Sequence, residues 1–434
     1  MNQTTMPVTA GFSGGARVRS SDRPWRGGAT TLPAPTLVEK GIILVLVTFL
    51  LVFPKGGIRV GGVPLTWGYA ALGLLSLTFP LALWKGLPWK VAPLRLLTAG
   101  LLLPFQLVVL AGLLLNGSEH PGFAVSLFVT FFLVPLAQVV LLGIHLDRID
   151  TAFLLRLVRG AIFLVAVYGI FLFAYKLATG RFIEIPLLTV NAGDLGTLET
   201  TKNIDRGGIF KLISTYNNGN IYGISILMLL PLYALLERNW VRTGMVKLSL
   251  LLTLSRTVWV GLLFYEIIQR LFVKRLSLRG VAVFLTSVVM LVAGVLYALD
   301  FMGVEVGFLF DPRLGGRIGQ WSVVETATLL PRGSFDGILE IVYLSILDTF
   351  GVLGLVTFLA AMTGPVLLWS AGAVPSGATM YKRALVAGLV TYLFVATSDG
   401  AILFIPVMAI YWFLVSLLLS PGFSAPAAPA APHR

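Results

Sequence analysis

The segment KLSLLLTLSRTVWVGLLFYEIIQR, Lys247–Arg270, is largely apolar but has Arg256 near its centre. Basic residues flank it on both sides: Arg238, Arg242, Lys274, Arg275 and Arg279. Because basic loops stay on the cytoplasmic side of a membrane, both ends belong on that side. About 22 residues cannot cross about 30 Å twice as full helices at about 1.5 Å per residue. The sequence therefore predicts two short helices or a re-entrant hairpin, with Ser255–Arg256 at the tip.

The rest of the chain is as apolar as this segment. Of its 434 residues, 57% are hydrophobic and 12% are charged, against about 45–50% and about 25% in ordinary globular proteins. Runs long enough to cross a bilayer recur at 38–53, 62–84, 93–115, 122–144, 159–178, 218–236, 281–299, 341–370, 383–398 and 401–419. With the short pair, they predict an all-α, polytopic integral membrane protein with about 12 transmembrane segments.

The charges give this bundle an orientation. The net charge is +13, but most Lys and Arg lie between apolar runs, which is typical of cytoplasmic loops and not of a nucleic-acid surface. The alternation predicts cytoplasmic termini and two outer loops, 179–217 and 300–340. Lys55 and Arg59 in the first outer turn go against this pattern. The chain has no cysteine, which excludes disulfides, thiolate metal sites and cysteine nucleophiles.

The domain organisation follows from composition. Residues 1–36 are rich in Gly, Ser, Thr and Pro, and 421–434 in Ala and Pro. We expect both segments to be disordered cytoplasmic tails. Residues 37–420 then form a single transmembrane domain that includes the two outer loops.

Ionisable side chains concentrate in the loop 300–340, which is far longer than the usual connection of about 4–6 residues. The spacing of Arg317, Trp321 and Glu325 predicts one face of a short helix at the membrane surface. Arg256 would lie inside the membrane, where an arginine is costly enough to suggest function, although it could also snorkel from a helix end.

Amides and hydroxyls gather where the other loop enters a span, in Ser214-Thr215-Tyr216-Asn217-Asn218-Gly219-Asn220. Such groups suit hydrogen bonding to a sugar or a lipid headgroup. Helix capping by Asn and Ser explains each of them equally well.

Four pieces in this order resemble the O-antigen polymerase and ligase family of membrane enzymes. They are Tyr216–Asn220 opening a span, Leu254–Trp259 in the short pair, Arg313 to Trp321 in the long loop, and Tyr343–Leu355 entering the next span. Together they cover about a third of the chain, and their order is more specific than any single piece.

The resemblance implies an activity on the periplasmic face of the bacterial inner membrane. A glycan carried by undecaprenyl diphosphate would move to an acceptor hydroxyl without nucleotide sugar, cofactor or metal, beside the flippase and the chain-length or export proteins of the same pathway. The departing diphosphate needs cations, for which planar guanidinium groups are suited. We assign Arg256 and Arg317 to that role, Arg313 and Arg206 as supports, and Tyr216, Asn217, Asn220 and Trp321 to substrate binding.

The sequence departs from the ligase branch at one point. Ligases of this family place a His-Asn pair before the last Tyr-Leu, whereas this chain has Glu340-Ile341-Val342-Tyr343-Leu344 and its histidines, His120, His145 and His433, lie elsewhere. A polymerase with Glu340 or Asp336 as general base fits better. Glu340 has a second interpretation, as a solvated carboxylate at a helix N-terminus. A ligase, a secondary transporter or lipid-linked glycan flippase, and a membrane scaffold remain alternatives.

Overall fold

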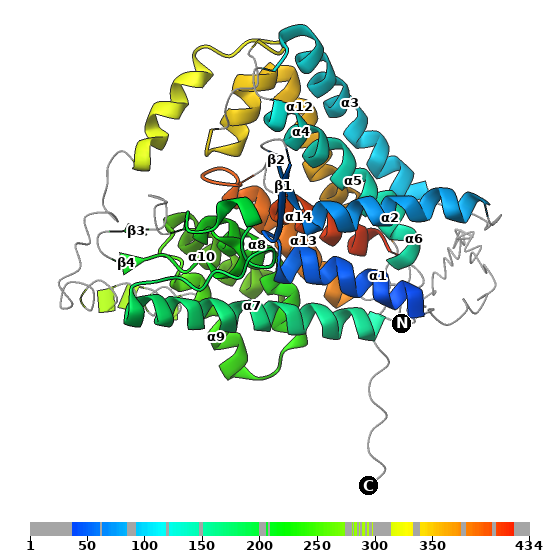
Figure 1. Cartoon of the computed structure of the whole chain (residues 1–434). Helices are drawn as coiled ribbons and strands as arrows, with labels where there is room; N and C mark the ends of the chain where they lie inside the picture. Colours follow the sequence, from blue (N-terminus) through cyan, green and yellow to red (C-terminus); the bar gives the residue numbers. More distant parts are fainter. Residues whose placement is uncertain are drawn as a thin grey trace, which may run out of the picture. The chain divides into compact units, whose positions relative to one another are not determined.

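A computed structural model of the chain describes residues 37–60, 63–84, 93–118, 121–146, 151–198, 205–206, 209–273, 314–332, 339–374, 379–401 and 405–420, and scattered positions between 280 and 297 (Figure 1). The expected tails and most of the expected span 281–299 lie outside these residues. The described part is mostly helical, with two short antiparallel β-hairpins. This confirms the all-α class.

The first span is α1 (Leu37–Val47), which continues as the π-helical turn η1 (Thr48–Val52). Strands β1 (Gly57–Val60) and β2 (Val63–Thr66) then form a hairpin, and α2 (Trp67–Trp84) follows. The second span was expected to begin at residue 62, but its helix begins at Trp67. Gly57 has φ +155° and lies against the Leu65 carbonyl, where a side chain would collide. A glycine is needed here for the two strands to approach each other.

The middle of the chain forms longer helices than the apolar runs suggest. In order they are α3 (Pro93–Asn116), then α4 (Pro121–Phe128), η2 (Val129–Leu133), α5 (Val134–Leu136), η3 (Ala137–Leu141) and α6 (Leu142–Leu146), and finally α7 (Thr151–Thr179). Helix α7 begins at Thr151, before the expected start of the run 159–178, and so includes Arg156. Arg95 lies in the first turn of α3 and is 1% exposed. Both helices extend into their basic flanks because helical hydrogen bonding does not require apolar side chains.

Loop 179–217 contains the short elements η4 (Ala192–Asp194), β3 (Asp205–Arg206), β4 (Ile209–Phe210) and η5 (Ser214–Tyr216). The second half of the chain contains α8 (Gly219–Leu236), α9 (Trp240–Leu251), α10 (Arg256–Val273), η7 (Leu314–Val324), α12 (Val342–Ser370), α13 (Thr379–Val395) and α14 (Ile405–Leu419). Helices α9 and α10 meet at residues 252–255, next to the expected tip at Ser255–Arg256. They are longer than expected, because α9 begins at Trp240 and α10 has 18 residues.

Five helices in the described residues are long and apolar enough to cross a membrane: Pro93–Asn116, Gly122–Leu141, Thr151–Thr179, Gly219–Leu236 and Val342–Ser370. Shorter apolar helices cover Lys40–Val52, Trp67–Leu77 and Pro406–Leu419. The protein is therefore an all-α polytopic membrane protein, while the expected number of about 12 spans stays a prediction.

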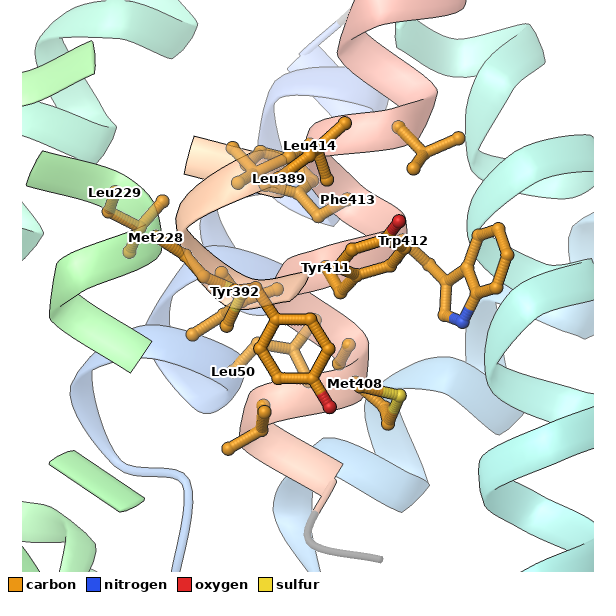
Figure 2. Packing of buried hydrophobic residues seen from close by; sticks show 14 of the residues in the cluster. Leu50, Met228, Leu229, Leu389, Tyr392, Met408, Tyr411, Trp412, Phe413 and Leu414 are labelled. Carbon is orange, nitrogen blue, oxygen red and sulfur yellow. The ribbon is translucent and has the colours of Figure 1, made fainter. Parts of the chain in front are cut away.

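Two helices form the centre of the fold. Nearly every described residue of α14, and most of α8, is buried, as expected for helices that are hydrophobic on all sides. Figure 2 shows Leu389 and Tyr392 of α13 between Met228 of α8 and Tyr411 of α14. The loops at the ends of α8 and α13 therefore start from a rigid base.

The loops at one end of these helices touch one another. The Asn191 side-chain amide donates to the Ile58 carbonyl at 3.0 Å, and Trp67 Nε1 donates to the Leu187 carbonyl at 2.5 Å. The first turn therefore lies at the same end as loop 179–217, as the alternation of basic segments predicts despite Lys55 and Arg59.

Helix α12 is broken at Gly351, where φ is +70° and ψ is −174°. The Val352 amide donates to the Thr328 carbonyl at 2.8 Å, and the Leu353 amide to the Leu329 carbonyl at 3.1 Å. The expected run 341–370 is therefore one element long and apolar enough to cross a membrane, Val342–Ser370, with an interruption at Gly351. The long loop supplies backbone acceptors where the second part of the helix begins.

Candidate functional site

The site is a cluster of charged and amide groups around Asp399, at the end of the buried helices. Arg317 Nη2 donates to Asp399 Oδ2 at 3.1 Å, and Arg317 Nε donates to Glu340 Oε2 at 2.6 Å. Asn220 Nδ2 donates to the same Asp399 oxygen at 2.5 Å. One carboxylate thus joins the start of α8, the long loop and the α13–α14 connection.

Asn220 is held by the cap of α8. The Asn218 side chain accepts from the amides of Asn220 at 2.8 Å and Ile221 at 3.2 Å, which fixes the first turn of the helix. Asn217 precedes the cap in the left-handed region, with φ 56°, and its side chain donates to the Thr189 carbonyl at 2.9 Å. Of the three asparagines in the motif, only Asn220 reaches the Asp399 cluster.

Tyr216 has a packing role. It is fully buried and its hydroxyl donates to the Leu51 carbonyl at 2.9 Å. Leu51 lies in the π-helical turn η1, where backbone hydrogen bonds join residues five apart instead of four. Tyr216 and Asn217, both assigned to substrate binding from the sequence, therefore anchor the loop in this structure.

Asp399 was missed by the sequence interpretation. It follows α13, its amide donates to the Val395 carbonyl at 3.0 Å, and the residue is 6% exposed. The available signal was an acidic residue in Ser398-Asp399-Gly400, between the runs 383–398 and 401–419. A lone carboxylate between two apolar runs marks a functional candidate in a membrane protein.

Burial raises the pKa of the Asp399 carboxyl from 3.8 to about 6, although the Arg317 guanidinium lowers it. Glu340 raises this pKa further, while the Asn220 hydrogen bond and the charge of the buried Lys211 lower it. Asp399 is therefore a carboxylate whose charge changes close to neutral pH.

Arg317 is placed by the geometry of η7. This element is a 3₁₀ helix, so side chains three positions apart share a face, with about three residues per turn. Arg317 is half-buried, Gln320 accepts from the Ile341 amide at 3.2 Å, and Val323 packs near Ile341. The expected face of Arg317, Trp321 and Glu325 was wrong because it assumed α-helical spacing. Trp321 is 58% exposed and lies on another side of the helix.

The short pair α9–α10 brings its turn to the same place. The Leu212 amide donates to the Leu252 carbonyl at 2.9 Å, and the Ser398 hydroxyl contacts the Thr257 hydroxyl at 3.4 Å. Arg256, half-buried at the first position of α10, is next to Thr257 in the chain. The turn is therefore a neighbour of the Asp399 connection.

Three predicted site residues cannot be placed. Arg313 and Asp336 lie outside the described residues, and Arg206 lies in β3 with its side chain outside them. In the part of the chain that the structure describes, no three His, Cys, Asp or Glu side chains are grouped to hold a metal ion.

The cluster offers a ligand the carboxylate of Glu340 and the guanidinium of Arg317. Glu340 has a side chain 55% exposed, whereas its partner Arg317 is 15% exposed, so a ligand can reach this ion pair from the side of the carboxylate. Asp399, 9% exposed at its side chain, keeps Arg317 in place. An anion that replaced Glu340 would meet a guanidinium that is already oriented.

Comparisons with known proteins give no further guide. No model of a protein family matches the chain, and no curated protein matches it.

Proposed function

We propose that the protein polymerises undecaprenyl-diphosphate-linked oligosaccharide repeat units into a surface or secreted polysaccharide, on the periplasmic face of the inner membrane. The observation that carries this proposal is the cluster of Arg317, Asp399 and Glu340 at the end of helices that are otherwise apolar. The ordered motifs that resemble the O-antigen polymerase and ligase family support it.

The reaction transfers a glycan between two oxygens. The hydroxyl oxygen of the acceptor sugar attacks the anomeric carbon of the donor glycan, and the bond from that carbon to the diphosphate oxygen breaks. Undecaprenyl diphosphate leaves with the electron pair, and the hydroxyl proton passes to a carboxylate. The protein must therefore supply positive charge on the leaving side and a base on the acceptor side.

Arg317 supplies the charge for the diphosphate. Its planar guanidinium is held by Asp399 through Nη2, while Nε faces the exchangeable Glu340. A diphosphate oxygen that displaced Glu340 would form a charge-assisted hydrogen bond. Arg256, at the neighbouring turn, adds positive charge, and Lys211 already acts on the Asp399 carboxyl.

Glu340 accepts the proton in this proposal. Its exposed side chain can reach a sugar hydroxyl, whereas Asp399 is enclosed and serves to position Arg317. Once a diphosphate oxygen has replaced Glu340 at Arg317, the Glu340 carboxylate no longer pairs with the arginine and can accept a proton in the same site. In this proposal Asp336 is the alternative base, Arg313 and Arg206 support the charge of Arg317, and Trp321 contributes to substrate binding.

The test uses purified protein in liposomes, supplied only with undecaprenyl-diphosphate-linked repeat units. A ladder of longer glycans is expected, without lipid A and without an ion gradient. Arg317→Ala should abolish the ladder, and Lys should restore it only in part because it lacks the planar fork. Arg332→Ala is the matched control, since Arg332 is an exposed arginine of the same loop that contacts only the Thr326 carbonyl among the hydrogen bonds described.

Other results would redirect the assignment. A ladder that requires a lipid A acceptor would identify a ligase. Movement of intact lipid-linked units without a new glycosidic bond would identify a flippase. Full activity of Arg317→Ala would remove the proposed role of the cluster.

A further inference from the structure

Helix η7 has three distinct faces, set by its 3₁₀ geometry. Arg317, Gln320 and Val323 face the body of the protein. Gly319 and Ser322 form an exposed polar face, and the exposed Glu325 follows directly after the helix. Ile318, Trp321 and Val324 form the third face, and they are 54%, 58% and 51% exposed. In a 3₁₀ helix side chains at i and i+3 eclipse, so these three apolar side chains form one continuous stripe.

Further apolar side chains are exposed after η7, beyond the polar residues Glu325 and Thr326. Leu329 and Leu330, which follow η7, are 69% and 56% exposed. The backbone of this segment is bonded to the break in α12, through Val352 to Thr328 and Leu353 to Leu329. Beyond the break, Val352, Leu353 and Val356 are 40%, 40% and 57% exposed. Exposed apolar side chains therefore occur on η7, on the segment after it and on α12 beyond the break.

The length of α12 places this junction at the membrane edge. From Val352 to Ser370 the helix is about 28 Å long at about 1.5 Å per residue. The hydrocarbon core of a bilayer is about 30 Å thick, so this part of α12 is just long enough to cross it. The break at Gly351, and Leu329 hydrogen-bonded beside it, therefore lie at the boundary between hydrocarbon and headgroups.

We infer that η7 lies on the bilayer surface, with Ile318, Trp321 and Val324 inserted among the lipid headgroups and upper acyl chains. The occupant of the stripe in this proposal is phospholipid, because α12 beyond the break is long enough to cross a bilayer and carries exposed apolar side chains next to this segment. Tryptophan is favoured at this depth, where its ring is partly apolar and its N–H can reach water. This inference does not depend on the proposed reaction.

The consequence is that one helix connects lipid and the charged cluster. Arg317 and Trp321 lie on different faces of η7, so a membrane contact on one face fixes the depth of the guanidinium on the other. The cluster would then lie at the level of lipid headgroups. A ligand with a phosphate group and an apolar tail could reach Arg317 without leaving the membrane.

The test uses the absence of cysteine in the chain. Single cysteines at positions 318, 321 and 324 are labelled with the fluorophore NBD, and the full-length protein is placed in phosphatidylethanolamine–phosphatidylglycerol vesicles. Ser322→Cys is the matched control on the polar face of the same helix. We expect blue-shifted emission at the three stripe positions, and quenching when the vesicles contain lipids brominated on the acyl chain. The Ser322 probe should keep the emission of a probe in water.

Because three positions are labelled, the test remains valid if one variant fails to insert into the membrane. Equal, water-like emission at the stripe and at position 322 would overturn the inference. Blue-shifted emission that brominated lipid does not quench would also overturn it, because it would show a protein partner or a second copy on the stripe. Stronger quenching by lipids brominated near the headgroup than near the chain end would support the shallow depth given above.

Discussion

Arg317 and Asp399 are separated by 82 positions in the sequence, yet Nη2 of the arginine lies 3.1 Å from Oδ2 of the aspartate. Their side chains are 15% and 9% exposed. Buried charges in a membrane protein are expensive unless they are paired, and such pairs concentrate at functional positions. This contact links the long loop to the connection between two buried helices and underlies the first prediction.

Activity should depend on the charge of Asp399. Because burial raises the pKa of this carboxyl to about 6, we expect activity to fall as the pH drops through about 6 and the charge on the partner of Arg317 is lost. Asp399→Asn should lower activity and remove this acidic limb. The measurement is the rate of glycan transfer between pH 5 and 8 for both proteins. An unchanged limb in the variant would contradict the assignment.

Stability should change with pH in the opposite direction. The folded-state pKa of Asp399 lies above its ordinary value of 3.8, so the folded state keeps a proton that the unfolded state releases. The stabilising contribution of this proton is present below pH about 4 and is lost as the pH rises through about 6. Thermal unfolding of the wild type and Asp399→Asn in detergent would separate this effect from the loss of activity.

Gly351→Ala should release the long loop. An added Cβ would lie 2.7–2.8 Å from the carbonyl oxygens of Thr328, Leu329 and Leu330, at a backbone φ of +70°. Backbone strain alone costs about 1–3 kcal/mol, and the collision adds to it. We expect faster hydrogen exchange of residues 314–332 and reduced activity, because Arg317 lies in this loop.

Gly244→Ala is the control for that experiment. Gly244 lies within α9 with no atom near its missing Cβ, so alanine should stabilise the helix by up to about 1 kcal/mol. The same exchange rates in both variants would show that the break in α12 does not hold the loop.

Arg95 should be a structural arginine. Its Nη1 donates to the Val139 carbonyl at 3.0 Å and to the Ser416 hydroxyl at 2.9 Å, and its Nη2 donates to the Ser416 carbonyl at 3.2 Å. Arg95→Met keeps the apolar stem but leaves buried acceptors without this donor, at about 1–3 kcal/mol each. Thermal unfolding should show a clear loss of stability. Arg332→Ala, which removes an exposed side chain bonded to the Thr326 carbonyl at 3.4 Å, should cost about 1 kcal/mol or less.

The orientation can be tested with two exposed positions. Thr197, in the loop 179–217, should react as cysteine with an impermeant thiol reagent added outside intact cells. Gly244→Cys, on the expected cytoplasmic side, should react only after permeabilisation. Both residues are exposed, so a difference in labelling reports the side of the membrane and not burial. The reverse pattern would invert the topology and place the cluster in the cytoplasm.

Sequence alone determined the membrane class and most of the spans in the described part. Apolar runs of about 20 residues have few alternatives to membrane helices. The length of Lys247–Arg270, with basic residues at both ends, was enough to predict a turn near Ser255–Arg256, although α9 and α10 extend beyond this segment. The sequence also indicated Arg317, Glu340 and Asn220 as site residues, because polar residues are few in so apolar a chain.

The tertiary structure decided which of these residues meet. The 3₁₀ geometry of η7 turned Arg317 inward and Trp321 outward, and the break at Gly351 depends on carbonyls supplied by a distant loop. Asp399 carries no local signal that identifies Arg317 as its partner. The pattern of apolar residues predicts which helices are buried. The pairing of a buried charge depends on the packing of α8, α13 and the long loop, which brings residues that are distant in the sequence together.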